Sequence, residues 1–180
     1  MGIEGIVPSL LSELGIPSFS PDPMEWEHSL YMEFGDKGDI KTLLTKAREN
    51  IFGQLPGDKK RDLTMGLYAI YTQSGECLYI GKSKNLYSRF YIHYQTSIGK
   101  EKVVKYREFF TKRPGPMTFK WIQIQFPLES SPDKENEAVK MDCYKGETLR
   151  IALERLITCH MLANSSRKRP TFEHEHPSIK

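Results

Sequence analysis

The chain has 180 residues, of which 27% are charged and 38% are hydrophobic, and its formal net charge is +3. This composition is ordinary for a soluble globular protein, and the length fits one domain with extensions. No apolar run is long enough to span a membrane, and the N-terminal residues lack the basic and apolar regions of a signal peptide. The three cysteines show no paired spacing, so we expect free thiols and an intracellular, cytoplasmic location.

Charge is distributed unevenly along the chain. Residues 1–65 carry 11 acidic and 7 basic side chains, whereas residues 82–120 carry 2 acidic and 10 basic ones. A basic segment beside an acidic one indicates a face that binds a polyanion. On charge alone, a solvated lysine-rich surface explains the pattern equally well.

The first 60 residues predict an irregular N-terminal extension. Residues 6–15 are a candidate for a short helix, and three prolines follow it. Residues 28–34 are a strand candidate. Apolar residues at helical spacing then predict an amphipathic helix over residues 39–53, which ends at a glycine.

The middle of the chain predicts a hairpin followed by a helix. The runs LYAIY (67–71) and CLYIG (77–81) are typical of strands, and Gly75 marks a turn between them. Ser83 is a candidate N-cap for a helix that continues to about residue 94. On the buried side of this helix we expect Leu86, Phe90 and Tyr94.

The remaining sequence completes a small mixed fold. Residues 100–112 predict a basic helix, and the aromatic and β-branched residues of 117–126 predict a strand. A polar excursion at 128–146 leads to a helix from Gly146 to residue 164, and a polar tail occupies 165–180. The order of elements predicts an α/β (α+β) fold with a small three-stranded antiparallel sheet flanked by helices.

The hairpin and the next helix gather polar side chains of one chemical kind. Pairing of the strands brings Tyr68 and Tyr79 into one neighbourhood. Gly66 and Gly81 lack side chains, so that backbone or a ligand can approach closely there.

Arg89 and His93 are four residues apart on the following helix, so they share a face, which we expect to point outward. With Lys82 and the two phenols they would line one cleft. The set suits a phosphodiester, because arginine binds phosphate oxygens, tyrosine or histidine transfers a proton, and lysine supplies positive charge.

The same stretch resembles the GIY-YIG nuclease superfamily. Gly66-Leu67-Tyr68 stands for the first signature, with leucine in place of isoleucine, and Tyr79-Ile80-Gly81 matches the second letter for letter. Ten residues separate the two tyrosines, a spacing that the family commonly uses. Arg89 follows the second tyrosine by ten positions, and His93 follows four residues later, as in many members.

The resemblance extends to a later helix and covers roughly residues 64–164. Residues 151–157 fit the family helix that bears one glutamate, which makes Glu154 the implied ligand of Mg²⁺ or Mn²⁺. Asn164 is the candidate for the asparagine that usually follows. The residues from Lys82 to Leu86 look like the family's linking segment. Candidate DNA-binding residues are Lys84, Asn85, Asn164, Lys105 and Arg107.

The resemblance implies a mechanism for hydrolysis of the phosphodiester bond. Tyr68 is the implied general base, with its pKa lowered by cations such as Lys82 or the metal. Arg89 would stabilise charge on the phosphoryl oxygens, and Tyr79 and His93 would orient water or share proton transfer. The products would carry a 3′-hydroxyl and a 5′-phosphate.

The implied function is a metal-dependent endonuclease that acts on double-stranded DNA. We expect residues 61–164 to form the catalytic domain, with insertions near 98–117 and 128–146, and residues 1–60 to contribute DNA recognition or dimer contacts. This organisation favours sequence-specific, restriction-type cleavage by a homodimer or by two sequential nicks. The alternatives are a repair or homing-type nicking nuclease of the same family and a non-catalytic nucleic-acid-binding module.

Several residues also have simpler interpretations. The two tyrosines are common residue types in strands. Glu147 is a rival metal ligand, although acidic side chains near a helix start also interact favourably with the helix dipole. Residues 173–176 alternate glutamate and histidine, but a polar tail is the simpler interpretation, and helix packing is the simpler role for Cys159 and His160.

Overall fold

The computed structural model describes residues 20–34, 42, 45–49, 65–97, 115–124, 126, 129, 131 and 133–164. The predicted helices at 6–15 and 100–112, the candidates Lys105 and Arg107, and the tail lie outside these residues. The helix predicted at 39–53 is described at 42 and 45–49, where it is helical. The named elements are η1 (Pro23–Glu25), β1 (His28–Phe34), β2 (Gly66–Thr72), β3 (Cys77–Ser83), α3 (Leu86–Ser97), β4 (Gly115–Gln123) and α5 (Glu137–Asn164).

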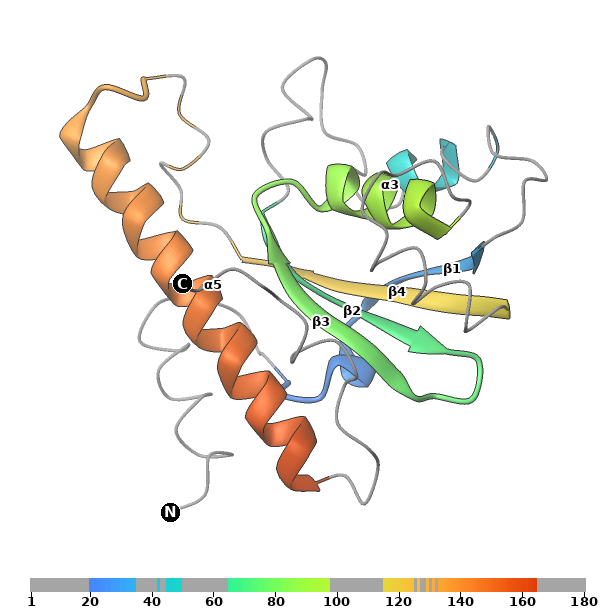
Figure 1. The fold of residues 1–180 in the computed structure, drawn as a ribbon. Coiled ribbons are helices and arrows are strands. Elements are labelled where there is room, and N and C mark those ends of the chain that lie inside the picture. Colours follow the sequence, from blue (N-terminus) through green and yellow to red (C-terminus); the bar gives the residue numbers. More distant parts are fainter. Residues whose placement is uncertain are drawn as a thin grey trace.

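The four strands form one antiparallel sheet in the order β1-β4-β2-β3 (Figure 1). The predicted antiparallel sheet flanked by helices is confirmed. It has four strands rather than three, because the candidate at 28–34 pairs along its whole length with β4. The predicted hairpin is confirmed as well, with Tyr68 opposite Gly81 and a turn in which Gly75 has a φ of 79°.

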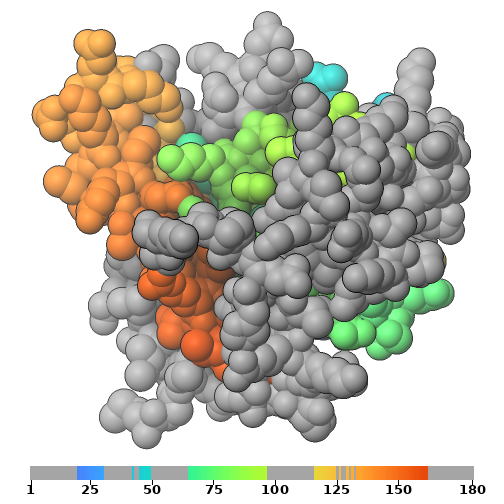
Figure 2. Space-filling model, viewed as in Figure 1, coloured from blue at the N-terminus to red at the C-terminus, as the bar shows by residue number. Residues whose placement is uncertain are grey.

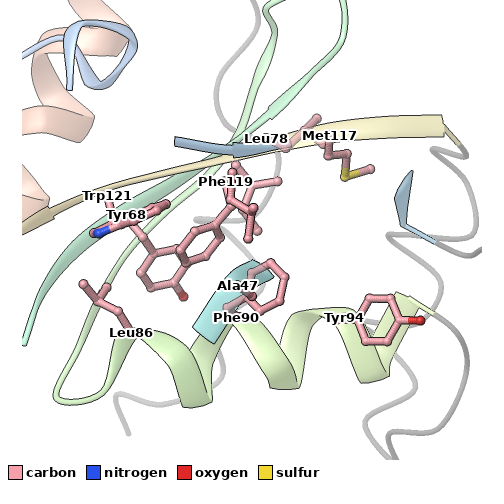
Figure 3. Packing of buried hydrophobic residues seen from close by; sticks show 11 residues of the cluster. Ala47, Tyr68, Leu78, Leu86, Phe90, Tyr94, Met117, Phe119 and Trp121 are labelled. Atoms are coloured by element: carbon pink, nitrogen blue, oxygen red, sulfur yellow. The ribbon is translucent and has the colours of Figure 1, made fainter. Parts of the chain in front are cut away.

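Strand β2 lies inside the sheet and is buried on both faces, which explains why its sequence is a continuous apolar run. Tyr68 and Ile70 point to one face, where they pack with Phe90 of α3 (Figure 3). Leu67 and Ala69 point to the other face. There they pack with three residues of α5: Leu149, Leu153 and Ile157. The sheet is therefore the middle layer between two helices.

Gly66 is required where β2 passes β4. A Cβ atom at this position would lie 2.0 Å from the carbonyl oxygen of Ile122, which belongs to the backbone of β4 and cannot move aside. The first glycine of the GLY signature therefore permits close pairing of the strands next to Tyr68. The prediction that backbone can approach closely at Gly66 is confirmed.

Helix α3 begins two residues later than the sequence predicted, at Leu86. Asn85, not Ser83, is its N-cap: the Asn85 side-chain oxygen accepts a hydrogen bond of 2.8 Å from the backbone N–H of Ser88. Ser83 instead forms a turn, in which its hydroxyl donates to the carbonyl of Asn85. The predicted buried stripe is confirmed, since Leu86, Phe90 and Tyr94 are all fully buried.

Helix α5 begins at Glu137, so the expectation of a polar excursion through residue 146 is wrong for 137–146. The side-chain oxygen of Asn136 accepts a hydrogen bond from the Ala138 N–H at 2.8 Å and starts the helix. The large apolar residues of these turns do not mark a buried face: Met141 and Tyr144 are exposed, where the start of the helix projects at the edge of the molecule (Figure 2, orange). Gly146, expected at the helix start, lies within it. The three cysteines of the chain are free thiols.

A buried ion pair explains the glycine within α5. Arg150 and Glu129 are each 1% exposed, and the guanidinium donates to both carboxylate oxygens, at 2.8 and 3.0 Å. Arg150 also donates to the carbonyl of Ile124, and the N–H of Phe126 donates to the carboxylate. A Cβ at Gly146 would lie 2.2 Å from a Glu129 carboxylate oxygen, so only glycine leaves room for the pair.

We predict that Gly146→Ala destabilises the protein. Alanine ordinarily stabilises a helix interior by about 1 kcal/mol relative to glycine. Here it would displace a carboxylate that is held by Arg150, and breaking a buried pair costs roughly 3–5 kcal/mol, or a fall in Tm of roughly 6–20 °C. Thermal unfolding measures the effect.

Ala152→Gly, at an exposed position of the same helix, is the matched control. It should lower Tm by only about 2–4 °C through helix propensity. A Tm of Gly146→Ala above that of the unmodified protein would contradict the packing described here.

Candidate active site

Tyr68 lies at the centre of the site. Its ring projects from β2 toward α3 and stacks on Phe119 at a centroid distance of 5.1 Å (Figure 3). The ring of Tyr79 also stacks on it, at a centroid distance of 5.6 Å. The phenolic oxygen lies 3.0 Å from Nε2 of His93, within hydrogen-bond distance. The hairpin therefore brings the two tyrosines together as predicted. The contact with Phe119 was not predicted, because an aromatic residue in a strand indicates only a core position.

Gly81 makes room for both phenols. It lies opposite Tyr68 in the hairpin, and a Cβ there would be 2.7 Å from the Tyr68 hydroxyl and 2.5 Å from the ring of Tyr79. The glycine of the second signature thus serves side-chain packing. The two signatures meet at one place, where the first supplies the phenol and the second supplies the space beside it.

His93 is buried, with 6% of its surface exposed, whereas Arg89 is exposed. The expectation that both point outward is therefore wrong for His93. The imidazole lies against the rings of Tyr68 and Tyr79, with centroid distances of 5.4 and 5.5 Å. These two rings cover the histidine, while the longer arginine one turn earlier reaches the surface.

The surroundings of Tyr68 keep its phenol protonated. Burial raises its pKa well above the ordinary value of 10.0, and the neighbouring Tyr79 raises it further. Two charges act on the same phenol: the positive charge of Arg89 lowers the pKa, and the negative charge of Glu154 raises it. Arg89 of α3, Tyr79 of β3 and Glu154 of α5 therefore all act on this hydroxyl, which β2 carries.

The surroundings of His93 keep its imidazole neutral. Burial, with a smaller contribution from the positive charge of Arg89, lowers its pKa from 6.5 to about 3. A neutral imidazole has one bare nitrogen that accepts a hydrogen bond. His93 can therefore accept the proton that the Tyr68 hydroxyl donates.

Lys82 and Glu147 form an ion pair between β3 and α5. Glu147 also lies 3.5 Å from the guanidinium of Arg150. Burial alone would raise the pKa of Glu147, but the hydrogen bond and charge of Lys82, with the charges of Lys84 and Arg150, hold it below its ordinary value. Glu147, the rival metal ligand, is thus paired with two cations.

Glu154 offers a single carboxylate, which suits a hard cation that keeps most of its water ligands. Within the described ranges, no three histidine, cysteine, aspartate or glutamate side chains are grouped as a closed metal site. Glu154 is half-buried, and its charge acts on Tyr68. One carboxylate combined with waters and phosphate oxygens fits Mg²⁺ or Mn²⁺, which bind few protein ligands in phosphate chemistry.

The predicted DNA-binding residues lie at different places. Lys84 is exposed in the connection between β3 and α3. Asn85 caps α3 through its side chain, which is a structural role, and its predicted DNA contact stays a prediction. Asn164 is the last residue of α5.

Comparison with known proteins supports the resemblance. Residues 64–140 match the family model of the GIY-YIG catalytic domain. The match supports the GIY-YIG superfamily for this part of the chain, and a domain of this superfamily implies a nuclease, a phosphodiester hydrolase whose substrate is nucleic acid. GIY-YIG nucleases generally depend on a divalent metal. The matched residues include Tyr68, Tyr79, Arg89 and His93, and end before Glu154.

None of the curated proteins and none of the solved structures matches the chain. In the part of the chain that the structure describes, none of the helices has the length and hydropathy of a membrane span.

The lowered pKa of His93 predicts how folding stability varies with pH. The unfolded chain binds a proton at this residue below about pH 6.5, whereas the folded protein leaves it neutral until about pH 3. His93 therefore contributes stability that is fully present above about pH 6.5 and is lost progressively as the pH falls toward 3, by at most about 1.4 kcal/mol per pH unit.

Urea unfolding at about pH 7 and about pH 5, for the unmodified protein and for His93→Gln, measures this contribution. The loss of unfolding free energy between the two pH values should be smaller in His93→Gln, by up to about 2 kcal/mol. Equal losses in both proteins would show that His93 titrates normally in the folded state.

Proposed function

We propose that the protein is a metal-dependent endonuclease that cleaves double-stranded DNA, and that Tyr68 receives the proton of the attacking water. The observation that carries the proposal is the contact between the buried Tyr68 hydroxyl and His93, with the opposite charges of Arg89 and Glu154 acting on it. Support comes also from the family match, which implies a nuclease.

A phenol that keeps its own proton acts as a base only if that proton has somewhere to go. The neutral His93 nitrogen lies 3.0 Å from the phenolic oxygen and accepts it. In the proposed step, a proton passes from water to Tyr68 while the Tyr68 proton passes to His93. Tyr79 stacks on Tyr68 and helps to exclude bulk water from this transfer.

In the proposed mechanism, Arg89 binds the phosphate and also controls the pKa of His93. In the protein without DNA its positive charge lowers the pKa of His93. When a phosphate group pairs with the guanidinium, the two charges offset each other, and a proton on His93 becomes easier to hold. Arg89 then also stabilises the negative charge that develops on the phosphoryl oxygens.

Glu154 is the proposed ligand of Mg²⁺ or Mn²⁺. A bound divalent cation supplies Lewis-acid stabilisation of the scissile phosphate and its leaving oxygen. Glu154 positions one carboxylate for this purpose on the helix that flanks the site. Its negative charge also raises the pKa of Tyr68, so a cation on Glu154 would remove that effect.

We further propose that cleavage is sequence-specific and of restriction type, carried out in the cytoplasm by a homodimer or by two sequential nicks. Three segments outside the site are the candidates for DNA recognition: residues 1–60, 98–117 and 128–146, the last of which includes the start of α5. Candidate contacts are Lys84, Asn85, Asn164, Lys105 and Arg107. A repair or homing-type nicking nuclease and a non-catalytic binding module are the alternatives that the test separates.

We predict that purified protein cleaves plasmid DNA in the presence of Mg²⁺ and that Arg89→Ala and Glu154→Gln each lower the cleavage rate by at least about 10²-fold. Arg89→Ala removes charge stabilisation at the phosphate, and Glu154→Gln removes the metal ligand. Both variants should still bind DNA in an electrophoretic shift assay, because the remaining basic residues are unchanged.

Glu76→Gln is the matched control, since it neutralises an exposed acid in the turn between β2 and β3, outside the proposed recognition segments. It should cleave at the rate of the unmodified protein. Discrete fragments from sequenced DNA would support restriction-type cleavage, and nicked circles would support the repair or homing alternative. Binding of DNA without cleavage on plasmids of varied sequence would leave only the binding module.

A further inference from the structure

The position of Glu154 depends on how α5 lies against the sheet. The apolar contacts of Leu149, Leu153 and Ile157 hold the helix to the sheet, but hydrophobic contacts are not directional. A helix held only by them can rotate, or slide by one turn of about 5.4 Å. Either movement would take the Glu154 carboxylate away from Tyr68.

A chain of ion pairs supplies the direction that the apolar contacts lack. Lys82 of β3 pairs with Glu147 of α5, and Glu147 lies 3.5 Å from Arg150. Arg150 in turn holds Glu129 and the carbonyl of Ile124 beyond the end of β4. Strand β3, helix α5 and the segment after β4 are therefore joined by directional ionic contacts. Fixing the register of packed elements is the best-attested role of buried ionic groups such as Arg150 and Glu129.

We propose that Glu147 is a positioning residue, which fixes the rotation and register of α5 through Lys82 and so places Glu154 at the site. This inference rests on the proposed function. Glu154 follows Glu147 by seven positions, which is about two helical turns, so they lie on one side of α5 about 10.5 Å apart. An anchor at Glu147 therefore sets the direction of Glu154.

The same geometry assigns Lys82 a part in positioning. Successive side chains of a strand point to opposite faces of the sheet. The Gly81 position faces the ring of Tyr68, and Lys82, the next residue, contacts α5. Lys82 thus acts through Glu147, and a direct contact of Lys82 with the phosphate is the competing possibility.

A distance measurement tests the proposal without reference to cleavage. Spin labels are placed on the exposed Cys159 of α5 and on an exposed position of α3, Ser88→Cys, after Cys77 and Cys143 are replaced by alanine. We expect one narrow distance distribution by double electron–electron resonance. Glu147→Gln and Lys82→Met should each broaden it or shift it by up to about 5 Å.

Two variants serve as controls for this measurement. Glu137→Gln makes the same chemical change in an exposed ion pair of α5, so it should keep the narrow distribution. Lys82→Arg keeps the charge and should restore it relative to Lys82→Met. An unchanged distribution in Glu147→Gln would overturn the proposal, because α5 would then keep its place without the anchor.

Cleavage measurements add a readout that general destabilisation would not change. Glu147→Gln should raise the Mn²⁺ concentration for half-maximal cleavage on the order of tenfold, with the Kd for DNA unchanged in the absence of metal. Lys82→Met, Glu147→Gln and the double variant should lose similar factors, because each removes the same link. Additive losses, or loss of cleavage in Lys82→Met with an unchanged distance, would show that Lys82 contacts the phosphate directly.

If the unmodified protein cleaves no DNA, the nuclease proposal fails. The distance measurement still tests whether Glu147 fixes the position of α5.

Discussion

The hydroxyl of Tyr68, buried 3.0 Å from Nε2 of His93, is the contact around which the rest of the molecule is arranged. Two polar groups are removed from water at this point, and each is tolerated because it is the hydrogen-bond partner of the other. The central strand carries the phenol, Gly81 leaves space for it, and α3 brings the imidazole to it. The protein core and the candidate site therefore share residues, so a substitution at Tyr68 would affect both the packing and the site.

Burial at this contact shifts the pKa values of the two groups in opposite directions, and both shifts favour the neutral form. It raises the pKa of Tyr68 and lowers the pKa of His93, so both are neutral at physiological pH. The charged members of the set, Arg89 and Glu154, lie nearer the surface and act on the phenol with opposite sign. Bound phosphate and metal would offset these two charges together. On the proposed function, these ligands would therefore change the proton affinity of the buried pair.

The sequence predicted what depends on local pattern. Two short strand-like runs and a turn glycine predicted the hairpin that brings Tyr68 and Tyr79 together, and helical spacing predicted the buried stripe of α3. The burial of His93 was missed, because it results from rings on two strands that no helical pattern records. The pair of Glu129 and Arg150 was missed because the two residues are far apart in sequence and their contact leaves no periodic signal. The sequence feature that reflects this pair is Gly146 within α5, which we interpreted as the start of the helix.

The ring nitrogens of His93 test the account most directly, because the proposed proton transfer requires a bare Nε2 facing the Tyr68 hydroxyl. In protein labelled with ¹⁵N-histidine, nuclear magnetic resonance at neutral pH distinguishes protonated from bare nitrogens, and His93→Gln identifies the signals. The account predicts a neutral ring with its proton on Nδ1, and a change in Tyr68→Phe that is confined to Nε2. A proton on Nε2, or a charged imidazolium at neutral pH, would contradict it.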